Sequence, residues 1–281
     1  MQQLAKGTYF GSHYQTSVLD GLIITDTQYT HKHVDWHRHQ NPYFTYLLQG
    51  KLYEANKKQE YYLSSGALLF HNWQDNHYNT KPDEYTRGFH VELSANWFKK
   101  HGFLQDSLEG SHLVENPKVK SLMNLVFMES KISDTHSQLS IDGLMLTVFN
   151  QLILDSTKIK NKQINWIEKL VEVVTDTRGN YSLTSLSDLL GVHPVHLSRE
   201  FHHYFGITFG QYIRYVRVNK AFNLILNSTM SMTDVCYECG FYDQSHFIRD
   251  FKRIYKKTPG EVLVSHRHSC EGRNSFVNTI I

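Results

Sequence analysis

The C-terminal third of the chain repeats itself, and this repeat constrains the fold more than any other feature. Residues 197–210 (LSREFHHYFGITFG) align with residues 247–260 (FIRDFKRIYKKTPG) at a constant shift of fifty positions. The matching pairs share their chemical character: Leu197/Phe247, Arg199/Arg249, Glu200/Asp250, Phe201/Phe251, Thr208/Thr258 and Gly210/Gly260. Self-similarity at a fixed spacing indicates one supersecondary unit used more than once. Two copies favour a duplicated module over a solenoid.

Each copy has the pattern of a helix-turn-helix. Thr184–Leu190 is a short helical run, Gly191 permits the positive φ of a sharp turn, and Pro194 opens a second helix at a position that tolerates proline. The second copy repeats the plan with Thr233–Cys239, Gly240 and a helix from Gln244 to Tyr255 that Asp243 caps. In such motifs the first turns of the second helix enter the major groove, where Arg can contact guanine and Gln adenine. The pattern predicts sequence-specific DNA binding.

Residues Leu183–Leu263 resemble the DNA-binding domain of the AraC/XylS regulators of bacteria. The residues that carry the resemblance are Gly191-Val192, Leu197-Ser198-Arg199, Phe201, Tyr204-Phe205-Gly206, Tyr212, Arg217, Ala221, Cys239-Gly240-Phe241, Asp243-Gln244-Ser245, Phe247, Phe251-Lys252 and Thr258-Pro259. The resemblance implies an all-α pair of helix-turn-helix subdomains joined by one long helix, here Thr208–Asn227. At ~1.5 Å per residue that helix is ~30 Å long, which suits two successive major-groove turns.

The resemblance also implies site residues and partners. Expected base contacts are Val195, Ser198, Arg199, Gln244, Ser245 and Arg249, and expected backbone contacts are His196, Lys252 and Arg253. The implied partners are double-stranded promoter DNA, RNA polymerase and a second copy of the chain, and the implied role is transcription activation. Two positions depart from the pattern. His193 stands where a small capping residue is usual, and Lys256 stands where the first copy has Gly206.

Composition sets weaker limits. The 281 residues suffice for about two domains, and the net charge of +2 is only weak support for a nucleic-acid partner. Local charge is more informative, because nine basic residues of the final third lie in or near the repeat: Arg199, Arg214, Arg217, Lys220, Arg249, Lys252, Arg253, Lys256 and Lys257. Three cysteines favour a reducing compartment, and no stretch resembles a signal peptide or a membrane span. We therefore expect a cytoplasmic protein.

The N-terminal region reads as short strands. Tyr43–Leu48, Tyr61–Leu63, Ala67–Phe70 and Phe89–Leu93 are β-rich and are separated by turn residues, which is typical of a sandwich or barrel. His37-x-His39 followed by Gly50, Gly66 and His77 is similar to the two motifs of the cupin barrel. The predicted fold class is thus an α+β two-domain chain with an N-terminal cupin-like β-barrel. The cupin pattern would place a metal-ligating Glu at Tyr43, where that carboxylate is missing.

This barrel leaves two interpretations open. His37, His39 and His77 could hold a divalent metal, as three imidazoles do in some zinc sites, or could line the barrel without one. We expect no tightly held metal and no cofactor, because three neutral imidazoles and a phenol would leave a cation uncompensated. The effector-pocket candidates are Trp36, His37, His39, Tyr43 and His77. The same aromatic residues could simply be core.

Residues 116–162 turn to a helical pattern, with an apolar stripe that includes Val119, Met123 and Leu139. This region could dimerise or pack back on the barrel, and polar Lys158–Lys162 is expected to be a linker. The predicted domains are a sensor barrel at 1–115, the helical linker at 116–162, the DNA-binding domain at 163–268 and a disordered tail at 269–281. Cys236 and Cys239 form a C-x-x-C that we interpret as structural, because both fall in the first helix of the second copy, where the resemblance implies small buried residues.

The sequence therefore predicts a DNA-binding transcription regulator, not an enzyme, that responds to a small molecule in the barrel. Two alternatives stay open: a metal-dependent cupin enzyme fused to a DNA-binding domain, and a DNA binder whose barrel only dimerises.

Overall fold

The computed structural model describes residues 2–72, 75–104, 107–108, 110–132, 134–161, 166, 169–170, 173 and 181–266. The chain divides into two compact units. Unit 1 comprises residues 1–114 and 125–147, and unit 2 comprises residues 115–124 and 148–281. The helical region at 116–162 is thus shared between the units instead of forming a body of its own. The expected tail at 269–281 lies outside the described residues.

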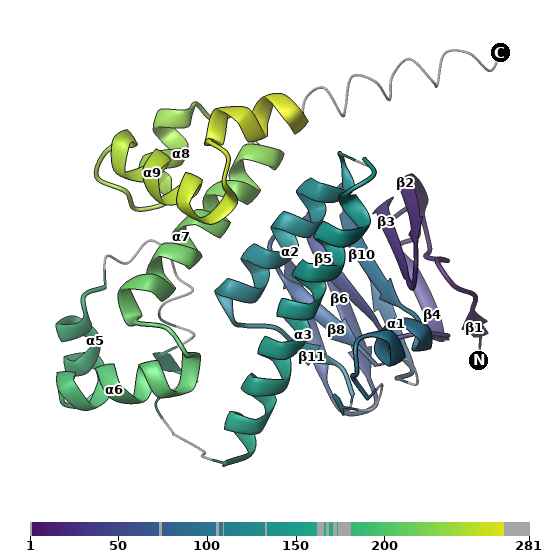
Figure 1. The fold of residues 1–281 in the computed structure, drawn as a ribbon, viewed down its shortest axis with the longest axis horizontal. Coiled ribbons are helices and arrows are strands. Elements are labelled where there is room, and N and C mark those ends of the chain that lie inside the picture. The colour runs from purple at the N-terminus through teal and green to yellow at the C-terminus, as the bar shows by residue number, and fades with distance from the viewer. Residues whose placement is uncertain are drawn as a thin grey trace. The chain divides into compact units, whose positions relative to one another are not determined.

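Strands make up most of unit 1 and helices make up unit 2 (Figure 1). The strands are β1 (Gln2–Leu4), β2 (Ser12–Leu19), β3 (Leu22–Gln28), β4 (His33–His39), β5 (Tyr43–Gln49), β6 (Lys51–Asn56), β7 (Glu60–Ser64), β8 (Leu68–His71), β9 (His77–Thr80), β10 (Arg87–Leu93) and β11 (His112–Leu113). The helices are α1 (Ala95–Lys100), α2 (Pro117–Ser130), α3 (Ser137–Asn161), α5 (Leu183–Leu190), α6 (Pro194–Phe205), α7 (Phe209–Asn227), α8 (Met232–Glu238) and α9 (Gln244–Tyr255). The α+β fold with a β-rich N-terminal domain and a helical C-terminal domain is confirmed.

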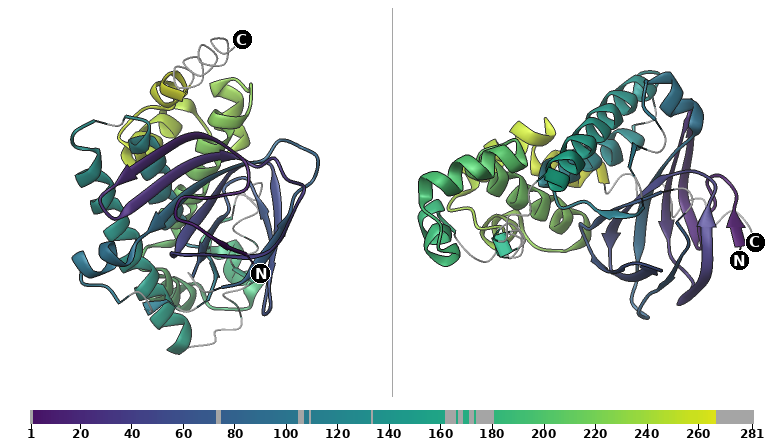
Figure 2. Two further views of the ribbon diagram at one scale, coloured as in Figure 1. Left: turned by 90° about the vertical axis from the view of Figure 1, so that its right-hand side faces the viewer. Right: turned by 90° about the horizontal axis from the view of Figure 1, so that it is seen from below.

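Two sheets build the barrel of unit 1. One has the strand order β1-β4-β9-β6-β7 and the other has the order β11-β8-β5-β10-β3-β2 (Figure 2). Every pairing between these strands is antiparallel except that of β1 with β4. Alternation of side chains sends every second residue of a strand inward, as β7 shows with Tyr61 and Leu63 buried between exposed neighbours. The predicted strands at residues 43–48, 61–63, 67–70 and 89–93 are all present.

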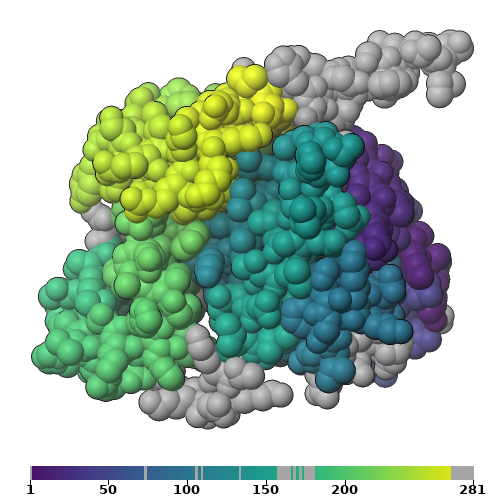
Figure 3. All heavy atoms as spheres, in the orientation of Figure 1, coloured from purple at the N-terminus to yellow at the C-terminus, as the bar shows by residue number. Residues whose placement is uncertain are grey.

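The two helix-turn-helix copies form as the sequence predicts. Gly191 ends α5 with φ +64°, and Gly240 takes φ +77° at the corresponding turn of the second copy. The side chain of Asp243 caps α9 by accepting a hydrogen bond from the backbone N–H of His246. His193 does the same for α6 through its ring, which accepts from the N–H of Val195. Helices α8 and α9 contact each other, and the end of the described chain that contains them is the yellow-green part of Figure 3.

Two predictions about the helical region are wrong. Residues 158–161 continue α3 instead of forming a linker, because lysine is a good helix former and polarity alone does not end a helix. Residue 162 lies outside the described residues. Leu139 is 78% exposed, so it does not belong to the buried stripe of α3, which runs through Ile141, Met145 and Val148.

A buried polar network joins the first part of α2 to the rest of unit 2. The side-chain oxygen of Asn219 accepts hydrogen bonds from the Ser121 hydroxyl (2.8 Å), the Asn124 amide (3.3 Å) and the Tyr255 hydroxyl (2.7 Å). The Asn219 amide in turn donates to the carbonyl of Pro117 (2.8 Å). Residues 115–124 are therefore part of the C-terminal unit by hydrogen bonding as well as by packing. None of the described helices is long and apolar enough to cross a membrane.

Candidate functional site

The expected base-reading residues of the first copy lie on the solvent side of α6. Leu197 and Phe201 are fully buried in an apolar cluster with Leu186 and Tyr212. The intervening positions Val195, Ser198 and Arg199 are exposed. Since side chains three and four apart share one face of a helix, the buried face fixes which residues can reach DNA.

The second copy presents the same arrangement on α9. Phe247 and Phe251 are buried, whereas Gln244, Ser245 and Arg249 are exposed. The Gln244 amide donates to the Thr233 hydroxyl of α8 at 2.6 Å, which holds that side chain at the start of the helix. The expected backbone contacts His196, Lys252 and Arg253 are exposed as well.

A buried acidic residue lies at the matched position of each second helix, and that of α9 forms an ion pair with α7. Asp250 of α9 lies 3.1 Å from Nε of Arg214 on α7 and 3.0 Å from Nε2 of His246. Its counterpart Glu200 of α6 lies 3.6 Å from Nε of Arg199. Helix α7 has 19 residues, which corresponds to ~28 Å at ~1.5 Å per residue.

Inside the barrel the structure brings His37, His39 and His77 together. One ring nitrogen of each lies within 4.8 Å of the others, and all three rings are buried. Nδ1 of His37 donates to the carbonyl of Asp35 (2.8 Å), and Nδ1 of His77 donates to the carbonyl of Asp75 (3.0 Å). Because a carbonyl only accepts, these Nδ1 atoms carry the protons, and the neutral rings present Nε2 lone pairs to the interior.

A second group lies against the first and shares His77. Glu54, His71 and His77 also bring one ligand atom each within 4.8 Å of one another, and all are buried. Oε1 of Glu54 is 3.2 Å from Nδ1 of His71, and Nε2 of His71 is 3.2 Å from the Thr45 hydroxyl. The cupin position of the carboxylate is Tyr43, whose hydroxyl lies 3.1 Å from Nε2 of His77. The cupin ligand set is therefore incomplete here, but a carboxylate is present from another strand.

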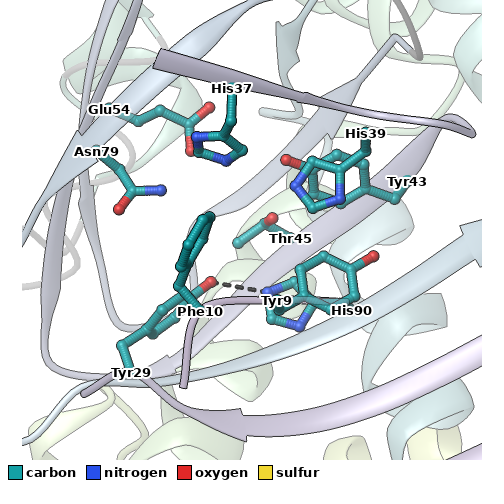
Figure 4. Close-up of a pocket in the computed structure, with 10 residues that line it drawn as sticks. All are labelled: Tyr9, Phe10, Tyr29, His37, His39, Tyr43, Thr45, Glu54, Asn79 and His90. Atoms are coloured by element: carbon teal, nitrogen blue, oxygen red, sulfur yellow. Dashed lines mark hydrogen bonds between the residues drawn. The ribbon is translucent and has the colours of Figure 1, made fainter. Parts of the chain in front are cut away.

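The pocket between the sheets is small. Its volume is about 20 Å³, which is room for roughly one water molecule. Its lining is shown in Figure 4 and consists of Tyr9, Phe10, Tyr29, His37, His39, Tyr43, Thr45, Glu54, Asn79 and His90. Of the effector-pocket candidates, His37, His39 and Tyr43 line it, whereas His77 and Trp36 do not. Alternation along β4 turns Trp36 to the opposite face, where it packs on Tyr78 with ring centroids 5.0 Å apart.

Burial keeps the interior histidines neutral at pH 7. Desolvation lowers the pKa of His77 to about 3, and it lowers the pKa of His90 to about 3. Burial and, secondarily, the neighbouring histidines lower the pKa of His39 and His71 far below the ordinary value. Burial, with a smaller contribution from Asp75, raises the pKa of Glu54.

The C-x-x-C cysteines lie in the core of the second copy. Cys236 is buried within α8, and Cys239 is buried at its end. Burial raises the pKa of Cys239 to about 12, so its thiol stays protonated near neutrality. Among the described residues, neither cysteine joins a group with metal-ligand geometry.

A family model described as a helix-turn-helix domain matches residues 186–264, which include both copies. The C-terminal unit contains an AraC-type helix-turn-helix domain. Over 79 residues the chain is 35% identical to the HTH-type transcriptional regulator GlxA of Rhizobium meliloti, covering 28% of this chain and 24% of that protein. Over 81 residues it is 32% identical to the HTH-type transcriptional activator RhaS of Escherichia coli, covering 29% and 27%. A longer match, 26% identical over 239 residues, joins 75% of this chain to 80% of the HTH-type regulator YbfI of Bacillus subtilis.

The matches to GlxA and RhaS span about a quarter of those relatives, 24% and 27% of their lengths. Within the AraC-type domain of this chain, the two departures noted in the sequence have structural solutions. His193 caps through its ring nitrogen, and Lys256 adopts the left-handed conformation with φ +59° that Gly206 adopts with φ +71° in the first copy.

Sequence reasoning did not propose eight interior residues of the barrel that line the pocket or join the metal-ligand groups: Tyr9, Phe10, Tyr29, Thr45, Glu54, His71, Asn79 and His90. Tyr9 stacks on His90 with ring centroids 3.8 Å apart, and the hydroxyl of Tyr29 lies 2.8 Å from Nε2 of His90. Strand alternation carries a signal for Glu54, since it lies two positions after buried Leu52 on β6, with half-buried Tyr53 between them. Pairing of β6 with β9 then brings it next to the strand of His77.

Proposed function

We propose that this chain is a sequence-specific transcription regulator that reads promoter DNA with α6 and α9. The observation that carries the proposal is the duplicated helix-turn-helix with Arg199 and Arg249 exposed at matched positions of the two second helices. An exposed Arg at the start of such a helix suits a bidentate contact to guanine. In this proposal Val195, Ser198, Gln244 and Ser245 complete the base contacts, and His196, Lys252 and Arg253 bind phosphates.

We further propose that the barrel is the sensing part and that the chain acts as a homodimeric activator in the cytoplasm, working with RNA polymerase. The relative RhaS is named as an activator, and a regulator needs a part that receives a signal. The polar, enclosed interior of the barrel supports this role, because buried polar groups are costly in a domain that serves only as a scaffold.

The rival function is a metal-dependent enzyme. The pocket of about 20 Å³ argues against it, because a substrate needs a cavity of roughly 300–1,000 Å³. An organic effector of that size would likewise require the side chains of the lining to move (Figure 4).

Selection of bound sequences from a random DNA pool tests the proposed function. With the full chain we expect one enriched motif with two parts about one helical turn apart. Arg199→Ala and Arg249→Ala should each weaken binding of that motif by about 1–3 kcal/mol and relax sequence preference in different parts.

The controls separate base reading from charge and from folding. Lys252→Ala should weaken binding to all sequences alike and flatten the salt dependence. Arg38→Ala, on the barrel strand β4, should leave DNA binding unchanged. An unaltered motif with Arg199→Ala would show that α6 does not read bases.

We also propose that the segment from about Asn165 to His268 binds DNA without the barrel. Its apolar cluster around Phe201 supports this, whereas the hydrogen bonds of Asn219 to Ser121 and Asn124 would be lost in the fragment. The fragment should therefore fold but melt below the C-terminal unit of the full chain, and circular dichroism measures both properties.

A further inference from the structure

We propose that the barrel interior binds one divalent transition-metal ion, with Glu54, His71 and His77 as its ligands. This site differs from the histidine set of the cupin pattern in its carboxylate and in His71. The proposal goes beyond the proposed regulatory function and does not depend on it.

The geometry at His71 is the first reason. Its ring is fully buried, and among the described residues its Nδ1 has no hydrogen-bond partner. That atom lies 3.2 Å from Oε1 of Glu54 without the alignment of a hydrogen bond, while Nε2 at the other side of the ring lies 3.2 Å from the Thr45 hydroxyl. If Nε2–H donates to Thr45, then the Nδ1 lone pair lies beside the Glu54 carboxyl group, and a cation that displaces the carboxyl proton could bind to both.

The second reason is that the His77 ring is already held in a tautomer and an orientation suited to metal binding. The hydrogen bond from its Nδ1 to the Asp75 carbonyl fixes the tautomer and the ring orientation, as backbone carbonyls do for metal-bound histidines. Its Nε2 lone pair is thus free to coordinate. In the structure this lone pair accepts from the Tyr43 hydroxyl, and binding of the ion would replace that hydrogen bond.

The charge of the ligands favours the group of Glu54, His71 and His77 over the overlapping group of His37, His39 and His77. His37, His39 and His77 are all neutral ligands, so an ion among them would keep its full charge in a buried site. Glu54 supplies a negative charge directly, and its burial costs less when a cation neutralises it. Two imidazoles and one carboxylate also form a known zinc ligand set with an open fourth position. Glu54 also lines the pocket of about 20 Å³, which has room for roughly one water molecule, whereas His71 and His77 are not among the residues that line it.

The test is zinc binding by the full chain after dialysis against a chelator, measured by isothermal titration calorimetry. We expect one Zn²⁺ per chain. Glu54→Gln and His71→Gln should each raise the Kd by more than about 100-fold, because even partners outside the ligand shell cost about 10–100-fold. His39→Gln should change the Kd by less than that, and His203→Gln, exposed on α6, should not change it.

Each outcome of this titration either supports the proposed site of Glu54, His71 and His77 or contradicts it. If His39→Gln abolishes binding while Glu54→Gln does not, the ion sits in the other histidine group and the proposal is wrong. If the wild type shows neither heat with Zn²⁺ nor visible absorption with Co²⁺, the barrel holds no such ion. Circular dichroism melts show whether each variant is folded, and if Glu54→Gln is not, the comparison of His71→Gln with His39→Gln still distinguishes the sites.

Discussion

The core around α6 and the interior of the barrel differ in how many polar groups they bury. Around α6 the core is apolar, with Leu186, Leu197 and Phe201 fully buried. The barrel has an apolar cluster that includes Leu47, Leu52 and Leu63, but it also buries five histidines and a carboxylate close to them: His37, His39, His71, His77, His90 and Glu54. An apolar core is stabilised by the removal of its surface from water, whereas each buried polar group must recover its lost hydration through a partner. The barrel interior is thus costly to maintain, and that cost favours a binding role over a purely structural one.

The largest effect is expected in the apolar core. Phe201→Ala removes a fully buried ring that contacts Phe205 and Tyr212, and the cavity should cost about 3–5 kcal/mol of unfolding free energy. In urea unfolding of the full chain, the C-terminal unit of this variant should unfold at a lower urea concentration, while the transition of the barrel should be unchanged. Val195→Ala, at a position 70% exposed, should stay within about 0.5 kcal/mol. A tolerant Phe201→Ala variant would mean that this core is less closely packed than its contacts indicate.

The same contrast explains what the sequence could predict. In the helical domain, residues with helical spacing and turn glycines define both the buried face and the exposed one, so the predicted bounds of α9 agree with the structure at both ends. The residue pattern also placed Gly191 and Asp243 correctly, because a positive φ and an N-cap each demand particular side chains.

The barrel interior was harder to predict because its members come from different strands. His37 and His77 lie 40 positions apart and meet only through the pairing of β4 with β9. Glu54 reaches them from β6, and no local pattern reports which strands become neighbours in a sheet. The cupin pattern correctly showed that the motif position is Tyr43 and carries no carboxylate, but it could not show that the sheet order brings Glu54 next to His71 and His77.

Low pH should lower the stability of the barrel more than that of the apolar core around α6. Burial lowers the pKa of His90 to about 3, while in the unfolded chain it is ~6.5. Between these values only the unfolded state binds the proton, so this contribution to stability is complete above pH 6.5 and is lost as the pH falls toward 3. Each pH unit below 6.5 should cost the barrel about 1.4 kcal/mol for this residue.

Urea unfolding of metal-free protein at pH 7, 6 and 5 measures the slope. The other buried histidines act in the same direction, and Glu54, whose pKa is raised by burial, acts in the opposite one. His90→Gln should therefore reduce the slope by about one proton, whereas His203→Gln should leave it unchanged. Equal slopes in the wild type and His90→Gln would show that His90 takes up its proton in the folded barrel.

The smallest effect should come from one hydroxyl of the polar interior. Thr45→Val nearly preserves the volume but removes the oxygen that lies 3.2 Å from Nε2 of His71. Leaving that buried ring nitrogen without its partner should cost about 1–2 kcal/mol of barrel stability. Thr16→Val, on the exposed side of β2, carries the same chemical change and should cost less than about 0.5 kcal/mol. The two melting curves, measured by circular dichroism in chelator, give the difference directly. If Thr45→Val proved as neutral as Thr16→Val, the hydroxyl would contribute nothing to the interior network. His71 would then have to satisfy its Nε2 in another way. That result would remove the reason for placing the ring proton on Nε2 and the lone pair on Nδ1, beside Glu54.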